Sequence, residues 1–266
     1  MKQFFRDVKN EEGFALVEVA IALIVMGVLL GIGLPSFLQY LQWQKIRDTK
    51  EKQEKIFYSV ASFVLQNGFV PLPADPYEKG ENFGMSRPSA QKSEDLRGLI
   101  PFKTLGLPEE CARDGFKHYF TYIGGAPQKE QIDVSNQASF CQVFPIHSLE
   151  VDERRPNGGF SKRPQNLASQ NPIVLIIISH GESGHGAYYG VAGSMKQISR
   201  LDQAGADKRH NASSSLRIIS RALSRKPQDF FDDMVVWVTR DNLMAFYGKS
   251  PCQVYEKPTE YGHVFI

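Results

Sequence analysis

The N-terminal part of the chain contains one long apolar run that carries a single charge. From Phe14 to Leu34 there are 21 residues, and all but Glu18 are Ala, Val, Ile, Leu, Met, Phe or Gly. A helix rises ~1.5 Å per residue, so the run is ~31 Å long and can cross the hydrocarbon core of a bilayer. An aspartate at the centre of such a helix costs roughly 2.5–3.5 kcal/mol on insertion scales, and Glu18 lies nearer one end, from which it could partly reach the interface. A purely structural anchor has no use for Glu18, so we expect this residue to serve a function.

The start of the run has the form of a known processing motif. Residues Gly13 to Glu18 read Gly-Phe-Ala-Leu-Val-Glu, which resembles the cleavage and N-methylation motif of type IV prepilins and type II secretion pseudopilins. In that family a prepilin peptidase cuts after the glycine and methylates the new N-terminal phenylalanine. The resemblance therefore implies a cytoplasmic leader over residues 1–13, a cut after Gly13 and methylation of Phe14. Pro35 lies where members of the family commonly carry a helix-bending proline.

The spacing of the motif also has a physical explanation. A cut after Gly13 creates a free α-amine on Phe14, and this cation can pair with Glu18 of a neighbouring copy when helices stack with a stagger. In a medium of low dielectric constant the pair is much stronger than on a surface. A glutamate near a helix N-terminus also complements the macrodipole. Glu18 is thus the predicted assembly residue, and the resemblance implies the same role for Pro35. An ordinary signal anchor with a stray glutamate is the alternative.

The helix is predicted to continue beyond the membrane. It spans residues 14–67, with a transmembrane part over 14–38 and a periplasmic part over 39–67. Asn67-Gly68, followed by two prolines, forms the stop signal. Pro35 is expected to bend or locally melt the helix. Apolar residues at helical spacing predict one face that packs against a domain: Ile56, Val60, Phe63 and Val64.

Short apolar runs separated by Gly and Pro follow, over residues 68–266, and indicate a periplasmic, β-rich globular domain. The predicted strands are Phe116–Ile123, Gln142–Ile146, Ile173–Ser179 and Met234–Thr239. We predict a short helix over Ser215–Ser224 and a polar loop over Val151–Asn171. The fold class is therefore α+β: a long N-terminal transmembrane helix packed on a small antiparallel sheet of three to five strands. The resemblance makes this fold type IV pilin-like.

Two later segments also resemble pseudopilins. These are the glycine-rich loop around Glu182, which follows a strand, and the acids that precede the last strand. In the family these parts build a calcium site, and calcium prefers several oxygen ligands on a flexible loop. The resemblance implies four carboxylate ligands: Glu182, Asp229, Asp232 and Asp233. The alternative is a turn with solvated acids that bind no metal.

The chain has three cysteines: Cys111, Cys141 and Cys252. In an oxidising periplasm we expect one disulfide and one free thiol. The pair Cys111–Cys141 closes the shorter loop and is the predicted disulfide. A Cys141–Cys252 pair and three unpaired thiols are the alternatives.

Taken together, these features predict a structural subunit of a type IV pilus-like or type II secretion pseudopilus filament, and no catalysis. Its expected partners are a prepilin peptidase, other pilin or pseudopilin subunits and an inner-membrane assembly platform. It is expected to cross the bacterial inner membrane once, with a periplasmic C-terminal domain, before it enters a filament. A net charge of +2 argues against nucleic-acid binding through bulk electrostatics. The competing class is a single-pass membrane-anchored periplasmic enzyme or binding protein.

Overall fold

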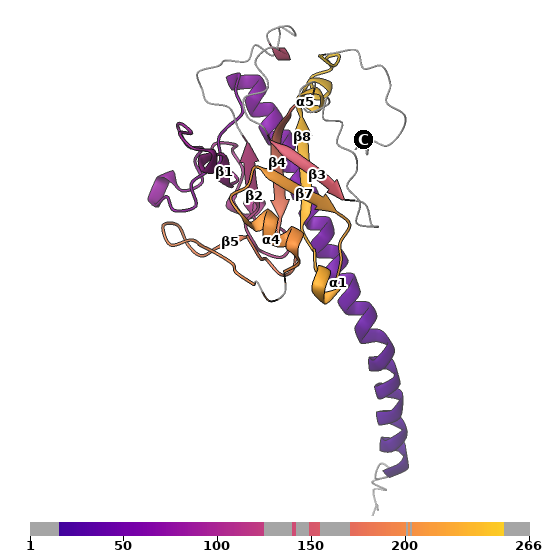
Figure 1. Cartoon of the computed structure of the whole chain (residues 1–266). Helices are drawn as coiled ribbons and strands as arrows, with labels where there is room; N and C mark the ends of the chain where they lie inside the picture. The colour runs from indigo at the N-terminus through magenta and orange to yellow at the C-terminus, as the bar shows by residue number, and fades with distance from the viewer. Residues whose placement is uncertain are drawn as a thin grey trace, which may run out of the picture. The chain divides into compact units, whose positions relative to one another are not determined.

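The computed structural model describes residues 16–124, 140–141, 149–154, 171–200, 202 and 204–252. Within these residues a long apolar N-terminal helix is combined with a small antiparallel sheet, so the protein is α+β (Figure 1). The chain divides into two compact units, Met1–Lys45 and Ile46–Ile266, and each is described by itself.

Helix α1 runs from Leu16 to Asn67 without interruption, which confirms the predicted helix over its described part. Pro35 lies inside it, so the predicted local melting there is wrong. A proline removes one backbone hydrogen bond, and the many good helix-forming residues on both sides keep the helix continuous. The helix ends at Asn67, and the next residue, Gly68, has a φ of 74° and donates its N–H to the Val64 carbonyl at 2.8 Å. Only glycine adopts this left-handed conformation without strain, so Gly68 is the predicted stop.

The C-terminal part of α1 buries one face in the compact unit. Ile56, Val60 and Val64 are at most 1 % exposed and belong to the main apolar core. Phe63 is only half-buried, and its ring lies 5.2 Å from that of Phe69. Full burial of an aliphatic side chain contributes roughly 1.5–3 kcal/mol, so this face fixes α1 to the sheet.

The main sheet has four antiparallel strands in the order β1-β2-β4-β8. Strand β4 (Ile173–Ser179) is central and almost entirely buried, because it pairs with β2 (Thr121–Gly124) on one side and β8 (Met234–Thr239) on the other. Strand β1 (Arg97–Leu99) forms the opposite edge. Both long strands have the predicted bounds.

Strand β2 is shorter than the predicted strand Phe116–Ile123 and begins only at Thr121. A turn precedes it, in which Asp114 Oδ1 accepts the N–H groups of Phe116 and His118, both at 2.9 Å. Lys117 adopts a φ of 72° in the same turn. Side-chain capping of the backbone therefore replaces ladder pairing here. The predicted strand Gln142–Ile146 lies outside the described residues.

A second layer covers the other face of the sheet. Strands β3 (Glu150–Arg154) and β7 (Arg217–Arg221) form a parallel pair, which corrects both the predicted helix Ser215–Ser224 and the start of the predicted loop Val151–Asn171. Alternate residues of a strand point to opposite faces. Accordingly, Ile177 joins the core with α1, whereas Ile176 and Ile178 join a second core with Ile218 of β7. This second core favours β7 over the helix suggested by local propensity.

The remaining elements are short. Two short helices follow the sheet strands in part: α4 (Ala206–Ala212) and α5 (Arg240–Phe246). A small antiparallel pair is formed by β5 (Tyr188–Tyr189) and β6 (Lys196–Gln197). The 3₁₀ turns are η1 (Gly80–Asn82), η2 (Ser93–Leu96), η3 (Glu109–Ala112) and η4 (Pro227–Asp229). Helix α4 and the two loops that flank β4 and β8 meet at one end of the sheet and form the polar cluster described below.

Candidate functional site

The first half of α1 carries its apolar side chains on the surface. From Leu16 to Leu38 the large apolar residues are 46–86 % exposed among those described. Near the N-terminus, therefore, α1 is long and apolar enough to cross a membrane. A helix that is apolar all round is stable only when lipid or other protein chains cover it.

Glu18 lies in the first turn of α1 as described and is exposed. It is the only Asp, Glu, Lys or Arg residue between Leu16 and Gln44. The first N–H groups of a helix lack partners within the helix and carry a partial positive charge, which favours a carboxylate at this place. Gly13 and Phe14 lie outside the described residues, so cleavage and methylation stay predictions.

Three glycines in the same segment have no packing role within the chain. A Cβ placed on Gly27, Gly31 or Gly33 would meet no other atom within 4 Å. Glycine inside a helix costs roughly 0.5–1 kcal/mol relative to alanine, so another benefit must offset this cost. Gly27 and Gly31 are four residues apart, the spacing at which small residues let two membrane helices approach closely. This spacing is visible in the sequence, but no role was predicted for it.

The four predicted calcium ligands do not form one site. Asp229 pairs with Arg221 at 2.7 Å, and Glu182 is exposed in the turn after β4. Asp232 and Asp233 both bind the ammonium group of Lys208. In the part of the chain that the structure describes, no three His, Cys, Asp or Glu side chains are placed to hold a metal ion. The predicted calcium site is therefore wrong, because the ammonium group of Lys208 occupies the position between the Asp232 and Asp233 carboxylates. No local sequence pattern marks Lys208 as the partner of these two acids.

Lys208 is fully buried, and each of its three ammonium hydrogens has an acceptor. Nζ lies 2.5 Å from Asp233 Oδ1 and 2.9 Å from the carbonyl oxygen of His180, and it also bonds Asp232 Oδ1. Asn211 Nδ2 donates to the second Asp233 oxygen at 2.9 Å. Burial alone would raise the pKa of Asp233, but the Lys208 ammonium and His180 lower it to about 2. Asp233 is therefore a buried anion with every oxygen partnered.

A hydroxyl, an imidazole and a carboxylate are aligned in the same cluster. His180 Nε2 lies 3.0 Å from Thr121 Oγ1, and its Nδ1 lies 3.4 Å from Asp233 Oδ1. All three residues are at most 2 % exposed, so no substrate can reach the hydroxyl. Burial lowers the pKa of His180 because it disfavours the imidazolium. The alignment links β2 to the residues that follow β4 and precede β8.

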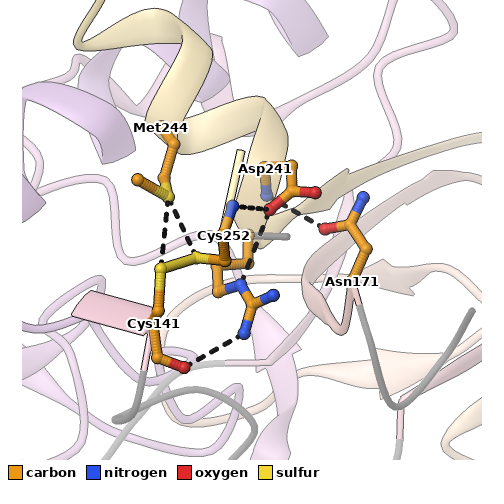
Figure 2. Close-up of a disulfide and its surroundings, with 6 residues drawn as sticks. Cys141, Asn171, Asp241, Met244 and Cys252 are labelled. Atoms are coloured by element: carbon orange, nitrogen blue, oxygen red, sulfur yellow. Dashed lines mark hydrogen bonds and ion pairs between the residues drawn. A yellow bond between two sulfur atoms is a disulfide. The ribbon is translucent and has the colours of Figure 1, made fainter. Parts of the chain in front are cut away.

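The disulfide joins Cys141 to Cys252 across a separation of 111 residues, and Cys111 is a buried free thiol. The predicted Cys111–Cys141 pair is therefore wrong. Figure 2 shows both bonded sulfurs beside Met244 of α5, whose Sδ lies 3.1 Å from Cys252 Sγ. Cys111 instead sits in the main core with the α1 residues. Loop length along the chain did not predict the pairing, because two thiols form a disulfide only when the fold brings them close together in space.

No protein-family model, curated protein or solved structure matches this chain. The candidate site is thus defined by the chain's own residues: an exposed apolar helix segment that carries Glu18, joined in sequence to a compact unit in which Lys208 pairs with Asp232 and Asp233.

Proposed function

We propose that this protein is a filament subunit of the type IV pilin-like class, most similar to a type II secretion pseudopilin. It is made as a precursor that crosses the bacterial inner membrane once, with the compact unit in the periplasm. The observation that carries the proposal is the composition of α1. One helix combines an exposed apolar half containing a single carboxylate, Glu18, with a second half packed into the compact unit.

Glu18 supplies the assembly chemistry in this proposal. A carboxylate is unfavourable in lipid, by up to roughly 2.5–3.5 kcal/mol at the centre of a spanning helix. When a prepilin peptidase cuts after Gly13, the new amine of Phe14 on an incoming subunit can pair with Glu18 of a subunit already in place. Neutralisation in a medium of low dielectric constant then favours transfer of the helix from lipid to the filament.

The rest of the apolar segment supplies the packing surface. Lipid and a bundle of apolar helices cover the exposed side chains equally well, so the same segment suits residence in the membrane and in a filament. Gly27 and Gly31 allow the backbone of a neighbouring helix to come close, which adds dispersion contacts. The expected partners are other subunits of the filament and an inner-membrane assembly platform.

The N-terminal residue of the mature protein tests the proposal. Mass spectrometry of the protein from its native membrane should find N-methylated Phe14, with residues 1–13 removed. Replacement Gly13→Leu should leave an uncut precursor in the membrane, whereas Glu11→Ala should be cut normally. A membrane-anchored enzyme or binding protein would keep the first 13 residues, and that result would reject the filament proposal.

A further inference from the structure

Lys208 lies between two carboxyl groups that have different surroundings. Its Nζ contacts Asp232 Oδ1 and lies 2.5 Å from Asp233 Oδ1. The side chains of Lys208 and Asp233 are fully buried, whereas that of Asp232 is 15 % exposed. The fold therefore gathers an amine, a carboxyl group that it can attack and a second carboxyl group that can carry protons.

From this geometry we propose that Lys208 and Asp232 condense within the folded chain to an isopeptide bond, with Asp233 as the proton relay. The step joins Lys208 Nζ to Asp232 Cγ and releases one Asp232 oxygen as water. Of the three ammonium hydrogens one stays in the amide, and Asp233 passes the other two to the departing oxygen. The reaction thus needs no oxidant, cofactor or second protein. It concerns the compact unit alone and does not depend on the proposed assembly function.

The loop after β4 holds the Asp232 carboxyl group in one position. The Ser183 backbone N–H donates to Asp232 Oδ2 at 2.8 Å, and the Ser183 hydroxyl donates to Oδ1 at 3.1 Å. The backbone N–H can stabilise the negative charge that develops on Oδ2 during attack, as in an oxyanion hole. Gly181 also approaches closely, because a Cβ at this position would lie 2.7 Å from Asp232 Cγ. Since the reacting groups are already in contact, little entropy is lost when they meet.

Asp233 is placed to remove the proton that blocks the amine. An ammonium group is not a nucleophile, and transfer of its proton to Asp233 Oδ1, 2.5 Å away, leaves the neutral amine. Burial assists the transfer, because it disfavours both charges of the ion pair. The bond has to form only once in each molecule, so a slow reaction is sufficient.

The charges of the cluster stay balanced after the reaction. Condensation removes one positive and one negative charge, and Asp233 keeps its electrostatic interaction with the buried guanidinium of Arg97. His180 Nδ1, which is buried without a hydrogen-bond partner among the described residues, lies 3.4 Å from Asp233 Oδ1 and can support this carboxylate. The product is a covalent brace between α4 and the residues just before β8.

Peptide mapping of the full chain, purified in detergent micelles and reduced, tests the proposal. Trypsin does not cleave after an acylated lysine, so the digest should contain residues 201–209 joined to residues 226–240. The joined peptide should be lighter than the two separate peptides by the mass of one water. Fragmentation in the mass spectrometer should place the bond at Lys208 and Asp232, and we expect it in most wild-type molecules.

The matched control is Lys208→Arg, which keeps the positive charge but has no amine that can form the bond. Asp233→Asn keeps the amine and the acceptor and removes the proton relay. Neither variant should contain the joined peptide, and both should migrate more slowly than the wild type on a reducing denaturing gel, because they lack the internal cross-link.

The wild-type digest decides the question even if the variants fail to fold. A wild-type chain that is folded by near-ultraviolet circular dichroism, yet is cleaved after a free Lys208 and yields no joined peptide, would overturn the inference. A bond to Asp233 instead of Asp232, or a joined peptide in Asp233→Asn, would reject the roles given to the two acids.

Discussion

The two regions of this protein handle charge in opposite ways. Between Leu16 and Gln44 the surface is apolar and carries one carboxylate. In the compact unit the arrangement is reversed, with an ammonium, two carboxylates and an imidazole gathered in the interior around Lys208. The buried Lys208 finds its counter-charges within the compact unit, whereas the first half of α1 depends on lipid or other chains to cover its surface.

The comparison shows where a partner is required. Exposed apolar surface on this scale indicates an interaction site, whereas a buried cluster of ion pairs and hydrogen bonds indicates stability or specificity of the fold. Changes in the apolar half should therefore affect assembly and leave the compact unit stable, and changes in the cluster or disulfide should do the opposite.

The largest expected effect is that of Glu18→Ala. Breaking a buried ion pair costs about 3–5 kcal/mol, so filament incorporation should fall at least about 100-fold while the protein stays in the membrane. Quantitative immunoblotting of sheared filaments and membranes measures both quantities. Glu81→Ala, at an exposed position in η1, is the control and should assemble normally. Normal assembly of Glu18→Ala would reject the role given to this carboxylate.

The disulfide should have the next largest effect. In the chain-entropy model a closed loop of about 100 residues contributes about 4.7 kcal/mol, so Cys252→Ser should lower the free energy of unfolding by about 4–5 kcal/mol. Chemical denaturation with and without reductant measures this, and the variant should not respond to reductant. In contrast, Cys111→Ala should keep the disulfide and abolish the one titratable thiol of the denatured, unreduced protein. Loss of the disulfide in Cys111→Ala would contradict the observed pairing.

One pair of substitutions tests the two halves of α1 with the same chemical change. Ile56→Ala should destabilise the compact unit by about 2–5 kcal/mol, because the side chain is fully buried and leaves a cavity. Ile24→Ala should not alter the stability of that unit, since Ile24 is 67 % exposed. Denaturant unfolding followed by near-ultraviolet circular dichroism distinguishes the two. Equal losses would show that the two parts of the helix are not independent.

The smallest expected effect is a pH dependence from His180. Burial lowers the pKa of His180 in the folded protein below the ordinary 6.5, so the unfolded chain binds its proton first as the pH falls. Stability should therefore fall as the pH is lowered from 7 to 5. His180→Gln should reduce this slope, with a remainder from His185, whose pKa burial also lowers. An unchanged slope in His180→Gln would assign the effect to other groups.

The stability from Asp233 should persist until the pH falls below about 4 and should disappear toward pH 2.

Local and periodic features of this chain could be predicted without the structure. The helix over Leu16–Asn67 follows from an apolar run, an uninterrupted stretch of good helix formers and the stop at Gly68. The bounds of β4 and β8 follow from their β-branched runs. Each of these signals depends on neighbours within a few turns of helix or one strand, so the sequence alone was sufficient. The exceptional position of Glu18 is likewise visible in the sequence.

Contacts between distant segments required the tertiary structure. Ser215–Ser224 has a mixed local pattern, and β7 forms there because Ile218 can be buried against β4 and because β3 offers a parallel partner. The choice of Cys252 over Cys111 depends on how α5 packs, and the position of Lys208 depends on α4 meeting the acids before β8. The physical reason is the same in each case. Burial energy and ion pairing depend on which groups become neighbours in space, and for segments far apart in the chain only the folded core determines that.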